Sequence, residues 1–159
     1  MAALSADKIR DRRGTNLTRV EAFSVKTSAT LYIGSMCALT TLNRVQAAAA
    51  ATGLRPAGVC VGVVNESGTQ ITAITGNAGG TVKALIEWGS EFLVDVSAAA
   101  QTYINVGKTV YIATDNEVTD TTAAGTAAVR VAIGVLTQFE TGKTVAWVQM
   151  RNYGDTGAV

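Results

Sequence analysis

One valine- and threonine-rich stretch, Ile104–Met150, constrains the fold more than any other part of the chain. Within it, the alternation of apolar and polar residues predicts strands at Thr109–Ala113 and Val129–Leu136, joined by a polar Thr/Gly-rich connection. A turn follows, and a closing strand is expected at Thr144–Met150. Short strands separated by turn residues are typical of a β-barrel or β-sandwich.

A similar module is found in the first half of the chain. The overlaid segments are Leu31–Ile33 with Val110–Ile112 and Val59–Val64 with Val131–Leu136. This overlay places Gly62 on Gly134, where the missing side chain would permit a strand bend or the close approach of another strand. We therefore expect a mainly β, antiparallel barrel or sandwich built from two related β-units. Chance agreement among common strand residues is the alternative.

The composition favours a protein whose surface is partly covered by partners. The chain has 159 residues, of which 48% are hydrophobic and only 16% charged. With so few charged residues, electrostatic repulsion between protein surfaces is weak. We therefore expect the protein to contact copies of itself or other proteins. No apolar run approaches the roughly 20 residues of a membrane span, and the N-terminus lacks a signal-peptide core. The protein is expected to be made in a cytoplasm and not to bind a membrane.

The charges divide the chain into a basic N-terminal arm, residues 1–19, and a single β domain, residues 20–159. Residues 1–20 carry five basic and two acidic side chains, whereas the remainder carries eight basic and ten acidic ones. The five basic residues of the arm are Lys8, Arg10, Arg12, Arg13 and Arg19. Two interpretations stay open: a disordered terminus, or an arm that becomes ordered against a partner surface. Because the body is mildly acidic, nucleic-acid binding is not expected as the main function.

The sequence offers no convincing catalytic or metal-binding set. It has no histidine, which excludes His-based triads and His metal ligands. Cys37 and Cys60 are expected to be buried free thiols. One compact acid cluster (Glu87, Glu91 and Asp95) lies on two expected strands, Val82–Trp88 and Glu91–Val96, predicted to form a hairpin across Gly89–Ser90. These carboxylates could serve a glycosidase or a metal ion, but a solvated sheet face produces the same pattern. We expect a non-enzymatic protein without a cofactor or metal.

The second module resembles a known family, the capsid cement or head decoration proteins of tailed bacteriophages. The resemblance rests on Gly107–Tyr111, Asn116–Thr119, Ile133–Leu136 and Gly142–Val148. Family members similarly pair a "G-x-x-V-Y" strand with an "I-G-V" strand and a final alternating strand. The match covers about the last 45 residues well and the first half loosely.

The resemblance implies a β-barrel or β-sandwich protein, commonly a homotrimer, on the outer surface of the virion capsid. There it would bridge neighbouring major capsid proteins and resist the pressure of packaged DNA. The arm would then act as a clamp on an acidic capsid surface, with Lys8, Arg10, Arg12, Arg13 and Arg19 as the capsid-binding residues. Two alternatives remain, namely another virion component such as a tail or spike protein, and an enzyme acting on polysaccharide through Glu87, Glu91 or Asp95.

Overall fold

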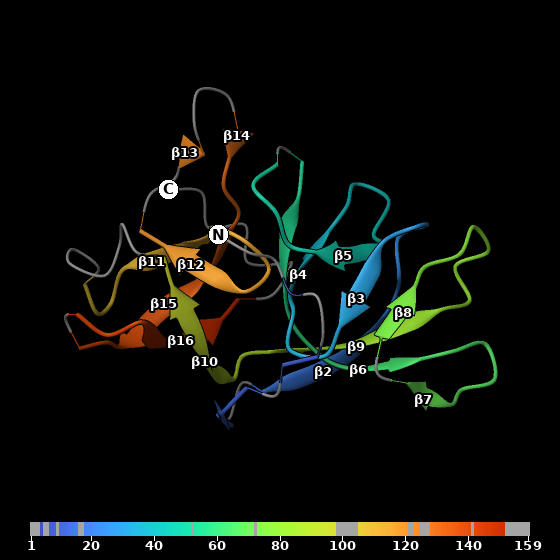
Figure 1. Cartoon of the computed structure of the whole chain (residues 1–159), viewed down its shortest axis with the longest axis horizontal. Helices are drawn as coiled ribbons and strands as arrows, with labels where there is room; N and C mark the ends of the chain where they lie inside the picture. Colours follow the sequence, from blue (N-terminus) through green and yellow to red (C-terminus); the bar gives the residue numbers. More distant parts are fainter. Residues whose placement is uncertain are drawn as a thin grey trace.

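All regular secondary structure in the described part of the chain is β-strand, which confirms the predicted fold class. The computed structural model describes residues 4, 7–8, 10–15, 18–51, 53–71, 73–97, 105–120, 123–124, 128–140 and 142–151. The strands form two units that lie side by side in Figure 1. The predicted split at residue 19 into an arm and one β domain stays a prediction, although the two units share one continuous body.

The two units contain five main strands each. The first unit comprises β2 (Arg19–Ser24), β4 (Met36–Leu39), β5 (Val45–Ala47), β6 (Arg55–Val64) and β9 (Lys83–Trp88). The second comprises β10 (Glu91–Val96), β11 (Thr109–Ile112), β12 (Glu117–Thr119), β15 (Ala132–Gln138) and β16 (Val145–Met150). The shorter strands are β1 (Arg12–Arg13), β3 (Thr30–Tyr32), β7 (Gln70–Ile71), β8 (Ala73–Thr75), β13 (Ala123–Ala124) and β14 (Ala128–Val129). Of these, β1 pairs with β10, β3 with β8, β7 with β6, and β13 with β14.

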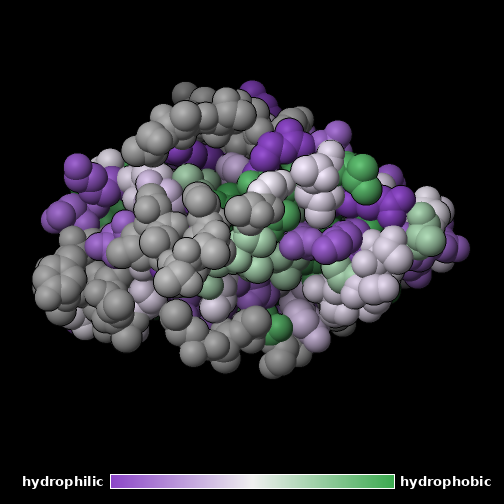
Figure 2. Space-filling view, turned by 90° about the horizontal axis from the view of Figure 1, so that it is seen from above, coloured by the Kyte–Doolittle hydropathy of each residue, from purple (hydrophilic) through white to green (hydrophobic). Residues whose placement is uncertain are grey.

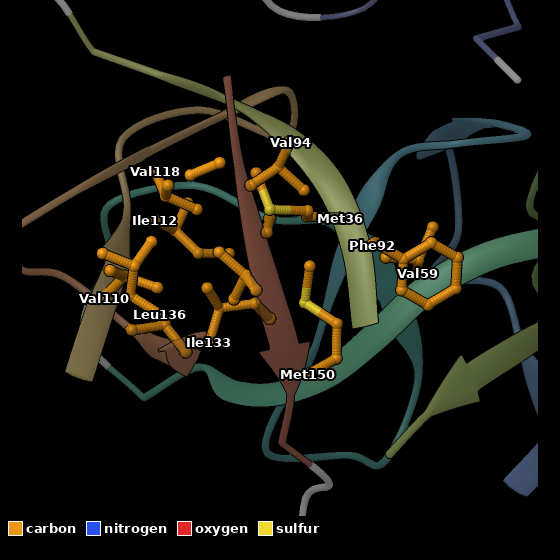
Figure 3. Packing of buried hydrophobic residues seen from close by; sticks show 14 of the residues in the cluster. Met36, Val59, Phe92, Val94, Val110, Ile112, Val118, Ile133, Leu136 and Met150 are labelled. Atoms are coloured by element: carbon orange, nitrogen blue, oxygen red, sulfur yellow. The ribbon is translucent and has the colours of Figure 1, made fainter. Parts of the chain in front are cut away.

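The second unit is a closed five-stranded barrel. Its strands follow the order β10-β12-β11-β15-β16, and β16 pairs back onto β10. All these pairings are antiparallel except the one between β10 and β12, which joins Asp95 to Glu117 and Val96 to Val118. Inward side chains from every strand fill the centre, and Met36 and Val59 of the first unit pack against the same cluster (Figure 3). The two units are therefore held together partly by a shared apolar core.

The first unit repeats this strand order, which confirms two related β-units. Its order β2-β9-β6-β4-β5 matches β10-β16-β15-β11-β12 strand for strand. The closing parallel contact is reduced to a single bridge, Val25 to Val45, where Lys26 N–H donates to the Val45 carbonyl at 2.8 Å. In the barrel, Ser97 N–H donates to the Val118 carbonyl at 2.9 Å. The first unit is thus an opened counterpart of the barrel.

The register corrects the overlay predicted from sequence, because Gly58 rather than Gly62 is the counterpart of Gly134. Gly58 pairs with Cys37 and Gly134 with Val110, and each pair is followed by a one-residue register shift. A Cβ atom at Gly58 or Gly134 would lie 2.2 or 2.3 Å from a backbone carbonyl oxygen of the next strand. These glycines permit close approach, as predicted for Gly134.

The same comparison corrects the other half of the overlay. The counterpart of β11 is β4, which pairs with β6 as β11 pairs with β15. Leu31–Ile33 was the predicted match, but β3 lies outside the main sheet and pairs with β8. The prediction was wrong because an apolar-tyrosine-isoleucine pattern specifies a strand without specifying its partner.

The predicted hairpin across Gly89–Ser90 is also wrong. Strands β9 and β10 belong to different sheets, with β9 between β2 and β6 and β10 against β16. Gly89 has a φ of 80°, and its N–H donates to the carbonyl of Met150 at 3.0 Å. Because Gly89 and Ser90 are hydrogen-bonded to Met150 of β16, they do not form a turn that pairs β10 with β9. They form the passage from one unit to the other.

One further strand differs from its predicted bounds. The expected strand Val129–Leu136 is interrupted, since β14 ends at Val129 and β15 begins at Ala132. The alanine-rich segment that starts at Val45 begins as the short strand β5. Its pairing with β4 favours the strand, because three residues gain hydrogen-bonding partners that an isolated short helix would lack.

Candidate functional site

The described part of the N-terminal arm adds a strand to the second unit. In β1, Arg12 and Arg13 pair antiparallel with Phe92 and Glu91 of β10. One step further along, the N–H of Leu93 donates to the carbonyl of Asp11 at 2.9 Å. The arm therefore covers the stretch of the β10 edge that β12 leaves open.

The three members of the acid cluster each bind a different cation of the arm. Glu87 is the most enclosed of the three, with 1% of its side chain exposed. It accepts a hydrogen bond from the Ser90 hydroxyl at 2.5 Å and forms an ion pair with the guanidinium of Arg12. A buried carboxylate needs such partners, because its desolvation is otherwise uncompensated. Glu87 is therefore a structural anchor for the arm.

The other two pairs are more exposed. Lys8 Nζ lies 2.6 Å from Asp95 Oδ2 and 3.2 Å from the side-chain oxygen of Asn116. Arg13 lies 3.9 Å from Glu91, and its guanidinium stacks 3.8 Å from the centre of the Trp147 ring. The Arg13 pair is half-exposed and contributes about 1 kcal/mol at most.

Arg10 is the one cation of the arm that is buried, with 8% of its surface exposed. Its Nε donates to the carbonyl of Gly34 at 2.5 Å, and its Nη2 donates to the side-chain oxygen of Asn116 at 3.0 Å. Burial lowers the pKa of Arg10 from its ordinary value, while the nearby carboxylates of Asp95 and Asp115 act in the opposite direction. The guanidinium thus joins the two units, because Gly34 belongs to the first and Asn116 to the second.

Backbone contacts of the arm with the first unit reinforce this connection. Lys8 N–H donates to the carbonyl of Ile33, and Ile33 N–H donates to the carboxylate of Asp7, both at 2.8 Å. Gly34 has a φ of 89°, and a Cβ atom there would lie 1.8 Å from the carbonyl oxygen of Lys8. Only a glycine permits the arm to lie so close.

A small cavity lies beside the arm where the two units meet. Its volume is about 210 Å³, and its lining includes Lys8, Arg10, Arg12, Gly34, Val61 and Phe92. The arm cations at its rim already have carboxylate or carbonyl partners, so the cavity offers space without an unused charge. It does not by itself define a ligand.

The structure places the five predicted capsid-binding residues in three different settings. Lys8, Arg12 and Arg13 pair with the acid cluster, and Arg10 is buried between the units. Arg19 is exposed in β2 and donates to the carbonyl of Thr18 at 2.8 Å. Capsid contact by these residues stays a prediction, but the structure gives four of them partners within the chain. The described residues of the arm therefore have binding partners without a second protein.

Sequence reasoning missed Gly34, Asn116 and Trp147, which complete the arm's binding surface. Their partners lie far away in the chain, as with Asn116 and Lys8, 108 residues apart. The available signal was the antiparallel order of two oppositely charged segments, residues 8–13 and 87–95. Matching those segments would have predicted the arm's position.

The two cysteines are free and buried, as predicted. Cys37 donates to the carbonyl of Ser35 at 3.3 Å, and Cys60 to the carbonyl of Gly62 at 3.5 Å. Burial raises the pKa of the Cys37 thiol well above its ordinary value. Low thiolate content and low exposure make Cys37 unreactive in the folded state.

Comparison with known proteins adds no family. No protein-family model matches the chain, and no curated protein matches its sequence. Among the described residues, no group of three or more cysteine and carboxylate side chains is arranged to share a metal ion. Within the same residues, no helix has the length and apolar character needed to cross a membrane.

Proposed function

We propose that this chain is a non-enzymatic structural protein of a tailed-phage virion, which binds the outside of the capsid and bridges major capsid proteins. The residues that resemble cement proteins lie on strands and turns of the second unit, such as Gly107–Tyr111 before and within β11. The proposal includes a homotrimer, no cofactor, and neither nucleic-acid nor membrane binding. Its localisation would be the capsid outer surface after synthesis in the host cytoplasm.

The observation that carries the proposal is the pairing of the acid cluster with the arm. Glu87, Glu91 and Asp95 were the best candidates for catalysis, and each has a cation of the arm beside it. A glycosidase needs one carboxylate as proton donor and a second as nucleophile or base, both open to the sugar. Carboxylates that hold a strand in place favour a structural role over the polysaccharide-acting alternative.

The surface supports an assembly role in a more general way. Among the coloured residues on the face shown in Figure 2, hydrophobic and hydrophilic residues are interspersed in small patches. Large apolar side chains are exposed at Val20, Leu42, Val106 and Val145. A surface with few charges and scattered apolar side chains suits contacts that are individually modest and are repeated many times over a shell.

The test is addition of the purified chain to capsids that lack it. The expected result is saturable binding to the outer surface, seen by electron microscopy, with higher resistance of the particles to heat or chelation. Binding at a tail or spike instead would establish the alternative virion role, and no binding to any particle would refute the proposal. Glu91→Gln provides the check on the enzyme alternative, because a polysaccharide-cleaving activity lost in this variant would favour catalysis.

The predicted contact of the arm with the capsid needs a variant that does not disturb the fold. Arg19→Glu is suitable, because Arg19 is exposed and its guanidinium donates to the carbonyl of the adjacent residue, Thr18. Lys143→Glu is a matched control, since Lys143 is exposed at a distant turn and 3.9 Å from Glu140. Lower capsid occupancy for the first variant alone is expected. Equal occupancy of both variants would exclude Arg19 from the contact.

A further inference from the structure

The outer edge of β2 is the counterpart of the β10 edge that the arm covers. The parallel contact that closes each unit involves Val25 after β2 in the first unit and Val96 of β10 in the second. Ala22 and Leu93 each lie three residues before these positions, so they are equivalent. The N–H of Leu93 donates to Asp11 of the arm at 2.9 Å. In the first unit, β2 is the terminal strand of its sheet.

The backbone of β2 presents hydrogen-bonding groups along this edge. The N–H of Val25 donates to Val82 at 2.9 Å, and the N–H of Lys26 donates on the opposite side to Val45 at 2.8 Å. Because the direction alternates along a strand, the even-numbered residues point away from β9. These residues are Val20, Ala22 and Ser24. No described residue forms a backbone hydrogen bond with them on that side, and Val20 is 52% exposed.

The two equivalent edges carry opposite charge. In the second unit, Asp95 binds Lys8 of the arm at 2.6 Å. Its counterpart in the first unit is Ser24, which accepts a hydrogen bond from Lys83 Nζ at 2.8 Å. An ammonium group thus stands where the other unit has a carboxylate. Two exposed cations flank β2, namely Arg19 at its start and Lys26 beyond its end.

We propose that the edge of β2 binds an extended acidic segment of a partner protein as an added antiparallel strand. The docked β1 strand is the geometric precedent, and the reversed charge selects the partner's composition. The segment would place a carboxylate near Lys83 and a small or apolar side chain near Val20. This inference goes beyond the proposed function, because it does not depend on the protein being part of a virion.

A second copy of the chain is a poorer occupant of this edge. Antiparallel pairing of two β2 strands about Ala22 would set Ser24, with its Lys83 ammonium, opposite Val20 of the other copy. Arg19 and Glu21 of that copy, which carry opposite charges, would then flank Val20, so this pairing gains no net charge attraction. An acidic strand, in contrast, brings only charges complementary to Arg19, Lys26 and Lys83.

The experiment uses the full chain and two synthetic eight-residue peptides, one alternating Glu with Val and one alternating Lys with Val. At low salt, the acidic peptide is expected to bind at least about tenfold more tightly, as judged by fluorescence anisotropy. The bound peptide should slow hydrogen exchange at the amides of Val20, Ala22 and Ser24. Equal binding of the two peptides, no binding, or protection at another edge would overturn the proposal.

Two variants separate edge pairing from general charge attraction. Ala22→Pro removes an outward N–H while leaving the bonds to β9 intact, so it should abolish binding without a large loss of stability. Lys83→Glu reverses the local charge, and its preference should change to the basic peptide. An unchanged preference in Lys83→Glu refutes the charge argument even if Ala22→Pro fails to fold. Dimerisation of the parent chain that Ala22→Pro abolishes would instead assign the edge to a second copy.

Discussion

Replacing Gly34 by alanine should detach the N-terminal arm without altering any residue of the arm or of the barrel core. The new Cβ atom would lie 1.8 Å from the carbonyl oxygen of Lys8. Unstrained carbon–oxygen contacts are about 3.3 Å, so the arm must withdraw by about 1.5 Å. The contact cannot be relieved by rotating a side chain, because both atoms are fixed to backbone.

The expected loss of stability follows from three contributions. Gly34 has a φ of 89°, and alanine in a left-handed conformation costs about 1 kcal/mol. Withdrawal breaks the bond from Lys8 N–H to the Ile33 carbonyl and the bond from Arg10 Nε to the Gly34 carbonyl. Each is worth about 1 kcal/mol net. The free energy of unfolding should therefore fall by about 3 kcal/mol.

Urea denaturation measures this loss, and limited trypsin digestion reports the arm separately. Arg12 and Arg13 are paired with β10, so detachment should increase the cleavage rate after them. Gly68→Ala is the matched control, because Gly68 has a φ of 76° and no atom lies within 4 Å of its added Cβ. It carries the conformational cost of about 1 kcal/mol without a steric conflict. Equal destabilisation of the two variants, with unchanged cleavage of the arm, would refute the reasoning.

Three further outcomes are expected. Gly134→Ala should destabilise the protein by at least about 2 kcal/mol more than Gly62→Ala in urea, because its Cβ would meet a backbone oxygen at 2.3 Å rather than side-chain atoms at 3.1 and 3.2 Å. Arg13→Ala should cost about 1 kcal/mol at most, since its ion pair is half-exposed, and a larger loss would contradict that estimate. The buried thiols of Cys37 and Cys60 should react with a disulfide reagent only at the rate of unfolding. Because burial raises the pKa of Cys37 above 9.0, the contribution of this thiol to stability should be present below that pH and lost as pH rises beyond it.

The sequence predicted individual strands better than it predicted their partners. Period-2 alternation located β10 and β16 within a residue, because one face of each strand is buried in the barrel. The same alternation is silent about pairing, so β9 and β10 were joined into a hairpin that does not form. Strand β9 instead pairs with β2 and β6, and β10 pairs with β16; β2 and β16 lie about 60 residues away from β9 and β10 in the chain. Adjacency in sequence favoured the local solution over these two distant ones.

The site was visible in the sequence as two separate features that were not connected. The basic arm was interpreted as a surface for another protein, and the acid cluster as a solvated face or a remote catalytic candidate. The structure joins Lys8 to Asp95 and Arg12 to Glu87 across 87 and 75 residues. Each feature is an incomplete ion pair when considered alone. Charge composition shows that a partner is needed, but only the three-dimensional register shows that the partner is within the chain.

Divergence in charge between the two units explains why the arm covers one edge and leaves the other open. Residues 19–88 carry five basic and three acidic side chains, whereas residues 89–159 carry four basic and seven acidic ones. Two units with the same strand order offer two equivalent edges, and backbone hydrogen bonding alone would not distinguish them. The carboxylate of Asp95 attracts Lys8, while the ammonium of Lys83 beside Ser24 would repel it. Side-chain charge therefore directs the basic arm to the second unit. The edge of β2 keeps its hydrogen-bonding groups for the acidic strand that we propose.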